Sequence, residues 1–309
     1  MSMDKVKTLS IYSFMNQFPD EGSAVSFFEK QLWGDKPVCT YCKKKNTSTR
    51  KSRKGHRCKE CRKDFSVRSS TIFENSRLPL HKWLYAMYLM VTARKGISSL
   101  QISKEIDVTQ KTAWFLMQRI REACNGNCEM LSGVVEMDET YIGGLESNKH
   151  AHKRVKGTQG RSTKTKAVVV GLKQRDGKVI ASSFNKVDSK SIQQYLDSRV
   201  LLGSTLSTDE ARFYGPIKGY KKLMVNHSVN EFVNGMASTN SIESVWAVLK
   251  RGYYGTFHHF RKKHIDRYVN EFTFRLNEGS CKIDTIDRIK FLVDGVRGKR
   301  LSYKRLINV

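Results

Sequence analysis

The 309-residue sequence predicts an α/β protein, in which a mixed five-stranded sheet with flanking helices is preceded by two smaller domains. Three observations lead to this prediction. They are two closely spaced Cys-x2-Cys pairs, two short amphipathic helices after them, and strand-like runs that alternate with helices beyond residue 131. We therefore expect five segments, with boundaries at 1–32, 33–70, 77–128, 132–277 and 278–309.

The charge balance predicts a polyanionic partner. The chain has 56 Lys and Arg against 29 Asp and Glu, which gives a net charge of +27 and a pI near 9.9. Nucleic acid is the first candidate, because each neutralised phosphate releases condensed counterions. The longest apolar stretch, residues 83–93, is too short to span a membrane, and the first 17 residues lack the apolar core of a signal peptide. We expect a cytoplasmic, nucleoid-associated protein with no membrane partner.

The first segment, residues 1–32, is predicted to be helical. Its apolar residues Ala24, Phe27, Phe28 and Leu32 recur at helical spacing. We assign it no chemistry and expect it to pack against the segment that follows.

Four cysteines in segment 33–70 predict a zinc ribbon. Cys39 and Cys42 form one pair, Cys58 and Cys61 form the other, and 15 residues separate the pairs. Tetrahedral zinc takes four thiolates, and each pair supplies two from a tight turn. The alternative is four free cysteines. His56 is a possible substitute ligand, but we expect a surface residue. The basic residues between the pairs predict a phosphate-contacting surface, with plain solubility as the alternative for any one of them.

Segment 77–128 is predicted to be a helix-turn-helix domain. A helix over 79–93 is followed by a short helix over 98–106, a break at 107–108, and a helix over 109–121 that Thr109 can cap. The N-terminal residues of the last helix enter the major groove in this motif, so Gln110, Lys111 and Thr112 are the predicted DNA readers. A purely structural helical pair is the alternative.

The pattern beyond residue 131 is that of a sheet with helices. Strand-like runs at 134–142, 167–172 and 178–184 precede a helix at 189–200, strands at 204–209 and 222–226, and a helix at 239–250. The turn sequence at 174–177 joins the second and third strands as a hairpin. Three antiparallel strands, a helix, two strands and a helix follow the order of a ribonuclease H-like fold.

Three carboxylates lie where such a sheet can bring them together. Asp138 interrupts the first strand, Asp209 ends the fourth, and Glu243 lies on the final helix, where Lys250 shares its exposed face. Two divalent cations can disperse charge from both oxygens of a phosphodiester under in-line attack, and magnesium prefers oxygen ligands. The alternative is a scatter of surface acids. Neighbours that could be chosen instead are Glu136, Glu139 and Glu210.

Basic residues lie on both sides of these acids in the sequence. The run 149–166 includes Arg154, Lys156 and Arg161, which we expect either to order against DNA or to form a solvated loop. Arg251 begins a stretch that interleaves bases with aromatics, which suits stacking on unpaired nucleotides. Tyr253 and His258 are the candidates for stacking, and core packing is the alternative. The segment 278–309 ends in a further basic patch.

Together these motifs resemble the DDE transposases of bacterial insertion sequences that carry an N-terminal zinc ribbon. The matching features are the two cysteine pairs, the 137–144 strand, residues 207–209, and residues 239–243 with Lys250. Asp209 and Glu243 are 34 residues apart, which is close to the spacing typical of the wider superfamily. Thr40 and Lys43 depart from the proline and glycine usual around the first cysteine pair, and this leaves the four ligands unaffected.

The resemblance implies a catalytic centre and a function. It implies that Asp138, Asp209 and Glu243 hold two Mg2+ (or Mn2+) ions, and that Asn240, His227 and Lys250 accompany them. The protein is then expected to bind the terminal inverted repeats of its element in double-stranded DNA, cut a strand and join the 3′ end to target DNA. Bringing two ends together implies a homodimer or larger assembly. The alternatives are a non-catalytic DNA-binding regulator and a structure-specific nuclease of the same fold.

Overall fold

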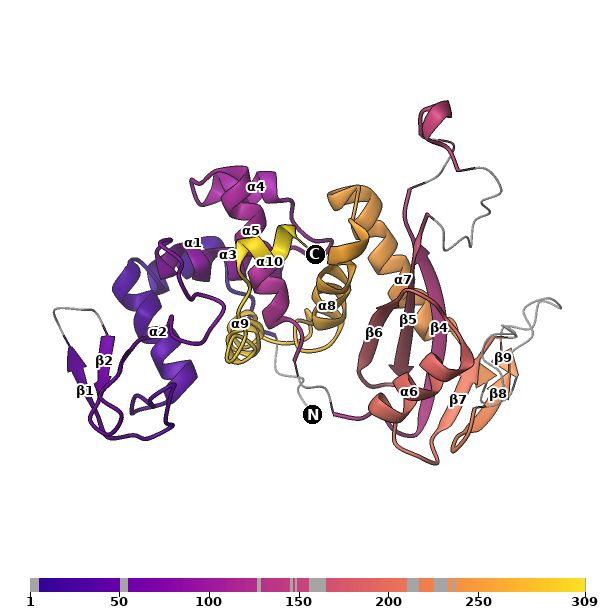
Figure 1. The fold of residues 1–309 in the computed structure, drawn as a ribbon, viewed down its shortest axis with the longest axis horizontal. Coiled ribbons are helices and arrows are strands. Elements are labelled where there is room, and N and C mark those ends of the chain that lie inside the picture. The colour runs from indigo at the N-terminus through magenta and orange to yellow at the C-terminus, as the bar shows by residue number, and fades with distance from the viewer. Residues whose placement is uncertain are drawn as a thin grey trace. The chain divides into compact units, whose positions relative to one another are not determined.

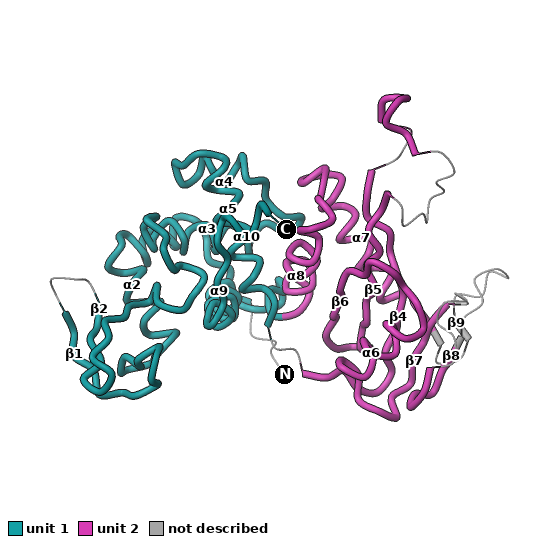
Figure 2. The backbone as a smooth tube through the Cα atoms, viewed as in Figure 1, with its two compact units in different colours: residues 1–126, 278–309 teal, residues 127–277 magenta. Residues whose placement is uncertain are grey.

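The computed structural model describes residues 6–50, 55–126, 129–144, 147, 149–155, 165–209, 217–224, 233–234 and 237–308. The chain forms two compact units, residues 1–126 with 278–309, and residues 127–277 (Figure 2). The C-terminal residues, a separate basic segment in the sequence, therefore share a unit with the N-terminal helices. None of the described helices is long and apolar enough to cross a membrane.

Helices make up most of the N-terminal unit (Figure 1). The segment predicted to be helical at 1–32 contains two helices, because Asp20 starts a new one with a capping box in which its side chain accepts from the Ser23 amide. The described helices of this unit are α1 (Ile11–Gln17), α2 (Glu21–Trp33), α3 (Leu80–Thr92), α4 (Ser99–Glu105), α5 (Gln110–Ala123), α9 (Thr285–Asp294) and α10 (Tyr303–Ile307).

The predicted helical pair is present as α4 and α5. Thr109 caps α5 by accepting from the Thr112 amide, as the sequence predicted. Asp107, with φ +49°, makes the tight turn between the two helices. The predicted apolar stripe of α5 is buried, and it comprises Ala113, Leu116, Met117 and Ile120.

A small antiparallel sheet follows α2 in the same unit. Its strands are β1 (Thr47–Arg50), β2 (Gly55–Cys58) and β3 (Asp64–Phe65), with β2 in the middle. Among the described residues, Cys39, Cys58 and Phe65 form its buried apolar cluster, with Trp33, Cys42 and Cys61 packed against it. So little apolar burial cannot stabilise a domain of this size, so the ribbon needs another source of stability.

The C-terminal unit is built on a five-stranded mixed sheet in the order β6-β5-β4-β7-β8. The antiparallel pairs are β4–β5 and β5–β6, and the parallel pairs are β4–β7 and β7–β8. The strands are β4 (Val134–Ile142), β5 (Ala167–Gln174), β6 (Val179–Phe184), β7 (Thr205–Thr208) and β8 (Lys221–Met224). The mixed sheet and its strand order confirm the predicted fold class.

Helices cover both faces of this sheet. On one face, α6 (Ser189–Arg199) packs on Val135, Met137 and Leu206, and Figure 1 shows it in front of the strands. On the other, α7 (Asn240–Gly252) and α8 (Ile265–Leu276) pack on Val169 and Val179. Shorter elements are η3 (Ala151–Lys153), β9 (Val233–Asn234), β10 (Ala237–Ser238), the π-helical turn η6 (Tyr253–Phe257) and η7 (Lys262–His264).

Candidate active site and metal centre

Asp138 and Asp209 come together in the middle of the large sheet. The parallel register of β4 and β7 pairs Met137 with Thr208, so the next residue of each strand is one of the two aspartates. Because β7 ends at Thr208, Asp209 lies where its strand gives way to a loop. Carboxylate oxygens of Asp138, Asp209 and Glu139 all lie within 4.8 Å of one another.

Two hydrogen bonds orient the Asp138 carboxylate. The Glu139 amide donates to Oδ1 at 2.8 Å, and the indole Nε1 of Trp246 donates to Oδ2 at 3.0 Å. Burial, followed by the charge of Glu139 and then that of Asp209, raises the pKa of Asp138 to about 7 against the effect of these two bonds. The site therefore concentrates negative charge where water solvates it poorly. Such a group of oxygen donors fits a hard divalent cation.

The raised pKa of Asp138 predicts how the stability of the metal-free protein depends on pH. Between about pH 4 and pH 7 the folded chain binds more protons at this site than the unfolded chain does, so stability falls as the pH rises. We expect Asp138→Asn to remove a penalty on the order of 2 kcal/mol, raising the free energy of unfolding at pH 8 but not at pH 4. Urea unfolding in EDTA at both pH values measures this difference. Equal effects of the substitution at the two pH values would contradict it.

Glu243 lies in the first turn of α7 and is exposed. Its Oε1 accepts from the Thr239 hydroxyl at 3.2 Å, and it is not in the group of described carboxylates within 4.8 Å of one another. Trp246, one turn later on α7, reaches Asp138, so this helix runs past the aspartates. Lys250 is also exposed, two turns beyond Glu243, as the helical spacing predicted.

Glu136 fixes the start of α7, a role that we did not assign from the sequence. Its side chain is only 2% exposed and accepts from the amides of Ser241 and Ile242, both at 3.0 Å. These amides belong to the first turn of the helix, where orphan donors and the helix dipole favour a negative charge. Arg175 lies 3.5 Å from the same carboxylate. Glu136 thus anchors α7 to β4 and does not join the Asp138 cluster.

Gly171 makes room for the indole that bonds to Asp138. It pairs with Asp138 across β4 and β5, and a Cβ at this position would lie 2.6 Å from the Trp246 ring and 2.9 Å from Ile242. We expect Gly171→Ala to force α7 away from the sheet and lower the free energy of unfolding by about 1–3 kcal/mol. Gly144→Ala is the control, because nothing lies within 4 Å of its added Cβ. Chemical denaturation of both variants compares them, and equal stability would refute the packing argument.

The four ribbon cysteines form a second group of ligands. Their sulfurs lie within 4.8 Å of one another, with 3.6 Å between Cys39 and Cys61 and 3.5 Å between Cys42 and Cys58. Tetrahedral zinc with Zn–S bonds of about 2.3 Å places its sulfurs about 3.8 Å apart. The spacing and the donor set therefore fit one zinc ion.

The thiols of this group share their protons unevenly. The Lys44 amide lowers the pKa of Cys42, but burial and the neighbouring sulfurs outweigh it and raise this pKa to about 12. The Cys61 amide contributes most to lowering the pKa of Cys58 to about 7. A zinc ion that binds all four sulfurs as thiolates would displace the protons for which these thiols compete.

The conformation of Lys43 and the burial of His56 bear on two expectations from the sequence. Lys43, which stands at a usual glycine position, adopts φ +62°, the left-handed conformation that glycine favours. His56 is not the surface residue that we expected. It is 6% exposed, its Nε2 lies 2.9 Å from Glu29, and its ring packs against Trp33 and Phe65.

Two parts of the chain match known families. Residues 130–277 match the ISXO2-like transposase domain, and residues 19–64 match the transposase zinc-ribbon domain. The chain is therefore a transposase with an N-terminal zinc ribbon. This confirms the family that the motifs resembled. A relative from Halobacterium salinarum, "Uncharacterized protein in transposable element ISH50", is 28% identical over 271 residues, covering 84% of this chain and 91% of the relative.

Two solved structures show low similarity to this transposase. The simian T-cell lymphotropic virus intasome in complex with PP2A regulatory subunit B56 gamma has a matching chain with a TM-score of 0.32 and 10% identity, covering 66% of this chain and 74% of that one. The Mos1 strand transfer complex gives a TM-score of 0.21 and 11% identity, covering 63% and 76%. Scores this low do not establish a shared fold.

The three predicted DNA readers of the transposase are all exposed at the start of α5. Gln110 donates to the Ser99 hydroxyl of α4 at 2.9 Å, and the Thr112 hydroxyl lies 2.9 Å from that of Thr109. The ammonium of Lys111 lies 4.9 Å from the centre of the Tyr303 ring. The structure thus presents these residues together at one helix end, and their contact with DNA stays a prediction.

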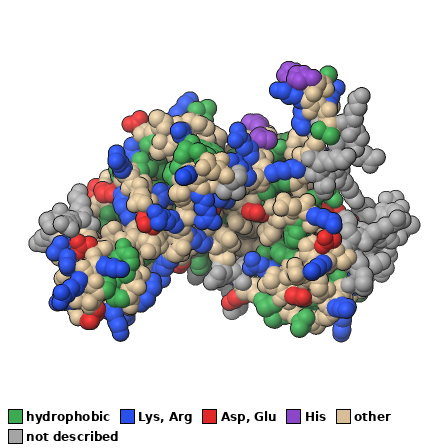
Figure 3. Space-filling model, in the orientation of Figure 1, with side chains coloured by type: hydrophobic (Ala, Val, Ile, Leu, Met, Phe, Trp, Pro, Cys, Tyr) green, Lys and Arg blue, Asp and Glu red, His purple; other side chains and the backbone are tan. Residues whose placement is uncertain are grey.

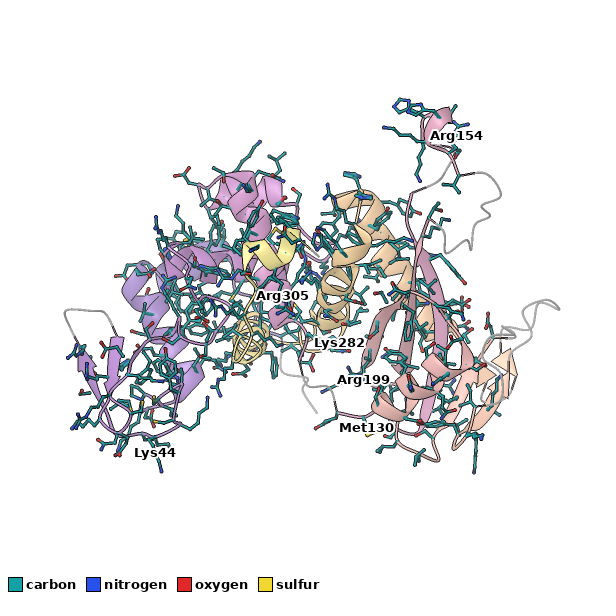
Figure 4. The ribbon with its side chains drawn as sticks, in the orientation of Figure 1. Lys44, Met130, Arg154, Arg199, Lys282 and Arg305 are labelled. Atoms are coloured by element: carbon teal, nitrogen blue, oxygen red, sulfur yellow. The ribbon has the colours of Figure 1, made fainter. Side chains whose placement is uncertain are left out.

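The other predicted DNA contacts are divided among several places. Arg154 donates to the Lys149 and Ser147 carbonyls at 2.9 and 2.8 Å and so braces its own loop (Figure 4). Asn240 and Arg251 are exposed at the two ends of α7. The predictions for Lys156, Arg161 and His227 fall outside the described residues.

Of the two aromatics considered for stacking, Tyr253 was wrongly assigned. It is 3% exposed and packs against Phe260, at 4.9 Å between ring centres, in the core beneath α7. Its neighbour Tyr254 is 60% exposed, and so is available to a ligand. Tyr253 begins the π-helical turn at 253–257, and its burial agrees with core packing, the alternative considered for it.

Proposed function

We propose that this transposase binds the terminal inverted repeats of its insertion sequence and catalyses magnesium-dependent DNA strand cleavage and strand transfer. The observation that carries the proposal is the meeting of Asp138 and Asp209 on adjacent strands, beside the helix that bears Glu243. These residues are far apart in the sequence, yet carboxylate oxygens of the two aspartates lie within 4.8 Å of each other, which supports a shared metal site.

In this proposal Asp138, Asp209 and Glu243 hold two magnesium ions. Bound there, the ions would neutralise charge on the entering and leaving oxygens of a phosphodiester. The Glu139 amide and the Trp246 indole hold Asp138 in place, and Glu136 fixes the start of the helix that carries Glu243. Lys250, on the exposed side of α7, would contact a phosphate near the scissile bond. Water would attack the phosphorus and displace the 3′ oxygen, which leaves as a 3′ hydroxyl, and that hydroxyl would attack a target phosphodiester and displace the 3′ oxygen of the target strand.

DNA binding in this proposal rests on the N-terminal unit. The exposed start of α5 would read bases in the major groove, and the basic ribbon would contact phosphates. The excess of positive charge supports a large phosphate contribution to affinity. Because two element ends must be joined in one event, we propose that the active assembly is a homodimer or larger.

One reaction separates this proposal from its two competitors. Purified protein is incubated with labelled duplex DNA carrying the inverted repeat that bounds the gene, a target plasmid, and MgCl2 or EDTA. A transposase yields label joined to the plasmid, with magnesium only. Cleavage without joining would indicate a nuclease, and binding without cleavage would indicate a regulator. Either of these results contradicts the proposal.

A further inference from the structure

The C-terminal tail of the chain runs along α5 in the direction opposite to the helix. The Lys299 ammonium donates to the Glu122 carbonyl at 2.9 Å, near the end of α5. Four residues later, the Tyr303 ring meets Phe115 edge-on at 5.4 Å and lies 4.9 Å from the Lys111 ammonium, near the start of α5. The tail therefore brings α10 to the end of α5 that carries the predicted DNA readers.

Buried contacts hold the tail in this position. Leu301 and Leu306 are 3% and 0% exposed, and the Gly298 amide donates to the Ser70 carbonyl at 2.9 Å. Ser302 caps α10 by accepting from the Arg305 amide. The tail is thus a packed part of the N-terminal unit, although the sequence suggested only a basic patch at the end of the chain.

Packing one side of α10 leaves its basic side chains exposed. Lys304 and Arg305 are exposed beside Leu306, and Figure 4 labels Arg305 on α10. Figure 3 shows Lys and Arg side chains over the part of the visible face that carries α10. Lys304 and Arg305 directly follow Tyr303, whose ring lies 4.9 Å from the Lys111 ammonium, so α10 and the start of α5 together contribute three exposed cations.

We propose that α10 and the start of α5 form one surface for duplex DNA. Lys304 and Arg305 contact the phosphates that flank the groove entered by α5, and Tyr303 is a positioning residue that holds Lys111 through a cation–π contact. This inference rests on the proposed function, since it needs the N-terminal unit to bind DNA. It adds a second contacting element and makes the end of the chain part of the DNA-binding domain.

The phosphate contacts are tested by removing two charges from α10. The variant Lys304→Gln/Arg305→Gln is compared with Lys7→Gln/Lys282→Gln, which removes two exposed lysines from the same unit near the start of α9. Affinity for the terminal-repeat duplex is measured over a series of salt concentrations. We expect the α10 variant to bind roughly 10-fold more weakly and to lower the slope of log K against log[salt] by about 2. The control should keep the wild-type slope.

The outcomes of this comparison distinguish the inference from the proposed function. Equal slopes for the α10 variant and the wild-type protein would overturn the inference alone. Equal losses in both double variants would also overturn it, because general charge would then suffice. A wild-type protein that does not bind the duplex would contradict the proposed function as well. Thermal unfolding of each variant verifies that the fold is kept.

The role of Tyr303 is tested by its coupling to Lys111. We expect Lys111→Gln to weaken duplex binding about 5-fold in the wild-type and Tyr303→Phe backgrounds, since either ring can hold the ammonium. In Tyr303→Leu the same substitution should cost less than 2-fold. A purely structural tyrosine would leave the effect of Lys111→Gln unchanged in all three backgrounds, which would overturn the positioning role.

Discussion

Asp138→Asn is expected to lower strand cleavage and joining by at least about 1,000-fold, with affinity for terminal-repeat DNA unchanged. Asp138 lies on the central strand β4, and its carboxylate is within 4.8 Å of those of Glu139 and Asp209. An amide there would remove one negative oxygen donor while keeping the size of the side chain. A metal site that supplies several kcal/mol of charge stabilisation accounts for a loss of this size. Single-turnover cleavage of labelled DNA and a binding titration measure the two quantities.

The matched control for this variant is Asp176→Asn. Asp176 is an exposed turn residue of the same unit with φ +57°, a conformation that asparagine adopts readily. We expect it to keep wild-type cleavage. Cleavage by Asp138→Asn at a rate near that of the control would remove Asp138 from the catalytic centre.

A second pair of substitutions determines which glutamate completes the site. Glu139 lies within the carboxylate cluster, whereas Glu243 lies outside it in the first turn of α7 and was assigned from the sequence motif. If Glu243 is the third ligand, Glu243→Gln should behave like Asp138→Asn, and Glu139→Gln should keep cleavage within about 10-fold of wild type. The reverse order would assign the third ligand to Glu139.

Cys58→Ser is expected to unfold the ribbon and release its zinc. Structural zinc contributes about 10–16 kcal/mol of binding free energy in small metal-stabilised domains. The ribbon has little else to replace this, because among its described residues Cys39, Cys58 and Phe65 form the buried cluster. The expected results are loss of one zinc per chain by elemental analysis, rapid proteolysis between residues 39 and 65, and weaker DNA binding.

Cys281→Ser provides the control, because Cys281 is exposed and lies outside the ribbon. It should retain the zinc of the wild-type protein and its resistance to protease. A Cys58→Ser protein with full zinc content and an intact ribbon would show that the four sulfurs are not one metal site.

The sequence was sufficient to predict those parts of the fold and the site whose contacts are local or follow from the order of the strands. The two cysteine pairs are each a tight turn, and Thr109 bonds to an amide three residues away. Asp138 and Asp209 are 71 residues apart, yet Asp138 lies on one recognisable strand and Asp209 directly follows another, and adjacent parallel strands bring equivalent positions together. Local pattern and strand order together were thus enough to place the two aspartates.

The sequence was insufficient to predict contacts between side chains of distant helices and strands, because no sequence pattern links such residues. Glu136 and Gly171 act on α7, which begins 104 and 69 residues further along the chain. In the sequence, Glu136 has no feature that distinguishes it from a solvent-exposed glutamate, because its partner amides lie in a helix that begins 104 residues later. The burial of His56 was missed for the same reason, since Trp33 of α2 packs against its ring. Tyr253 packs against Phe260, only seven residues away, but the alternation of bases and aromatics does not reveal which rings turn inward.

The hydrogen bond from Trp246 to Asp138 gives the protein an optical probe of its own. Indole emission responds to charge beside the ring, and this ring lies 3.0 Å from the carboxylate at the centre of the site. The other three tryptophans, Trp33, Trp83 and Trp114, all belong to the N-terminal unit. The difference in emission between the wild-type protein and Trp246→Phe is the contribution of Trp246. This contribution should change when Asp138 binds a metal ion or a proton, and it can be measured without a label and without DNA.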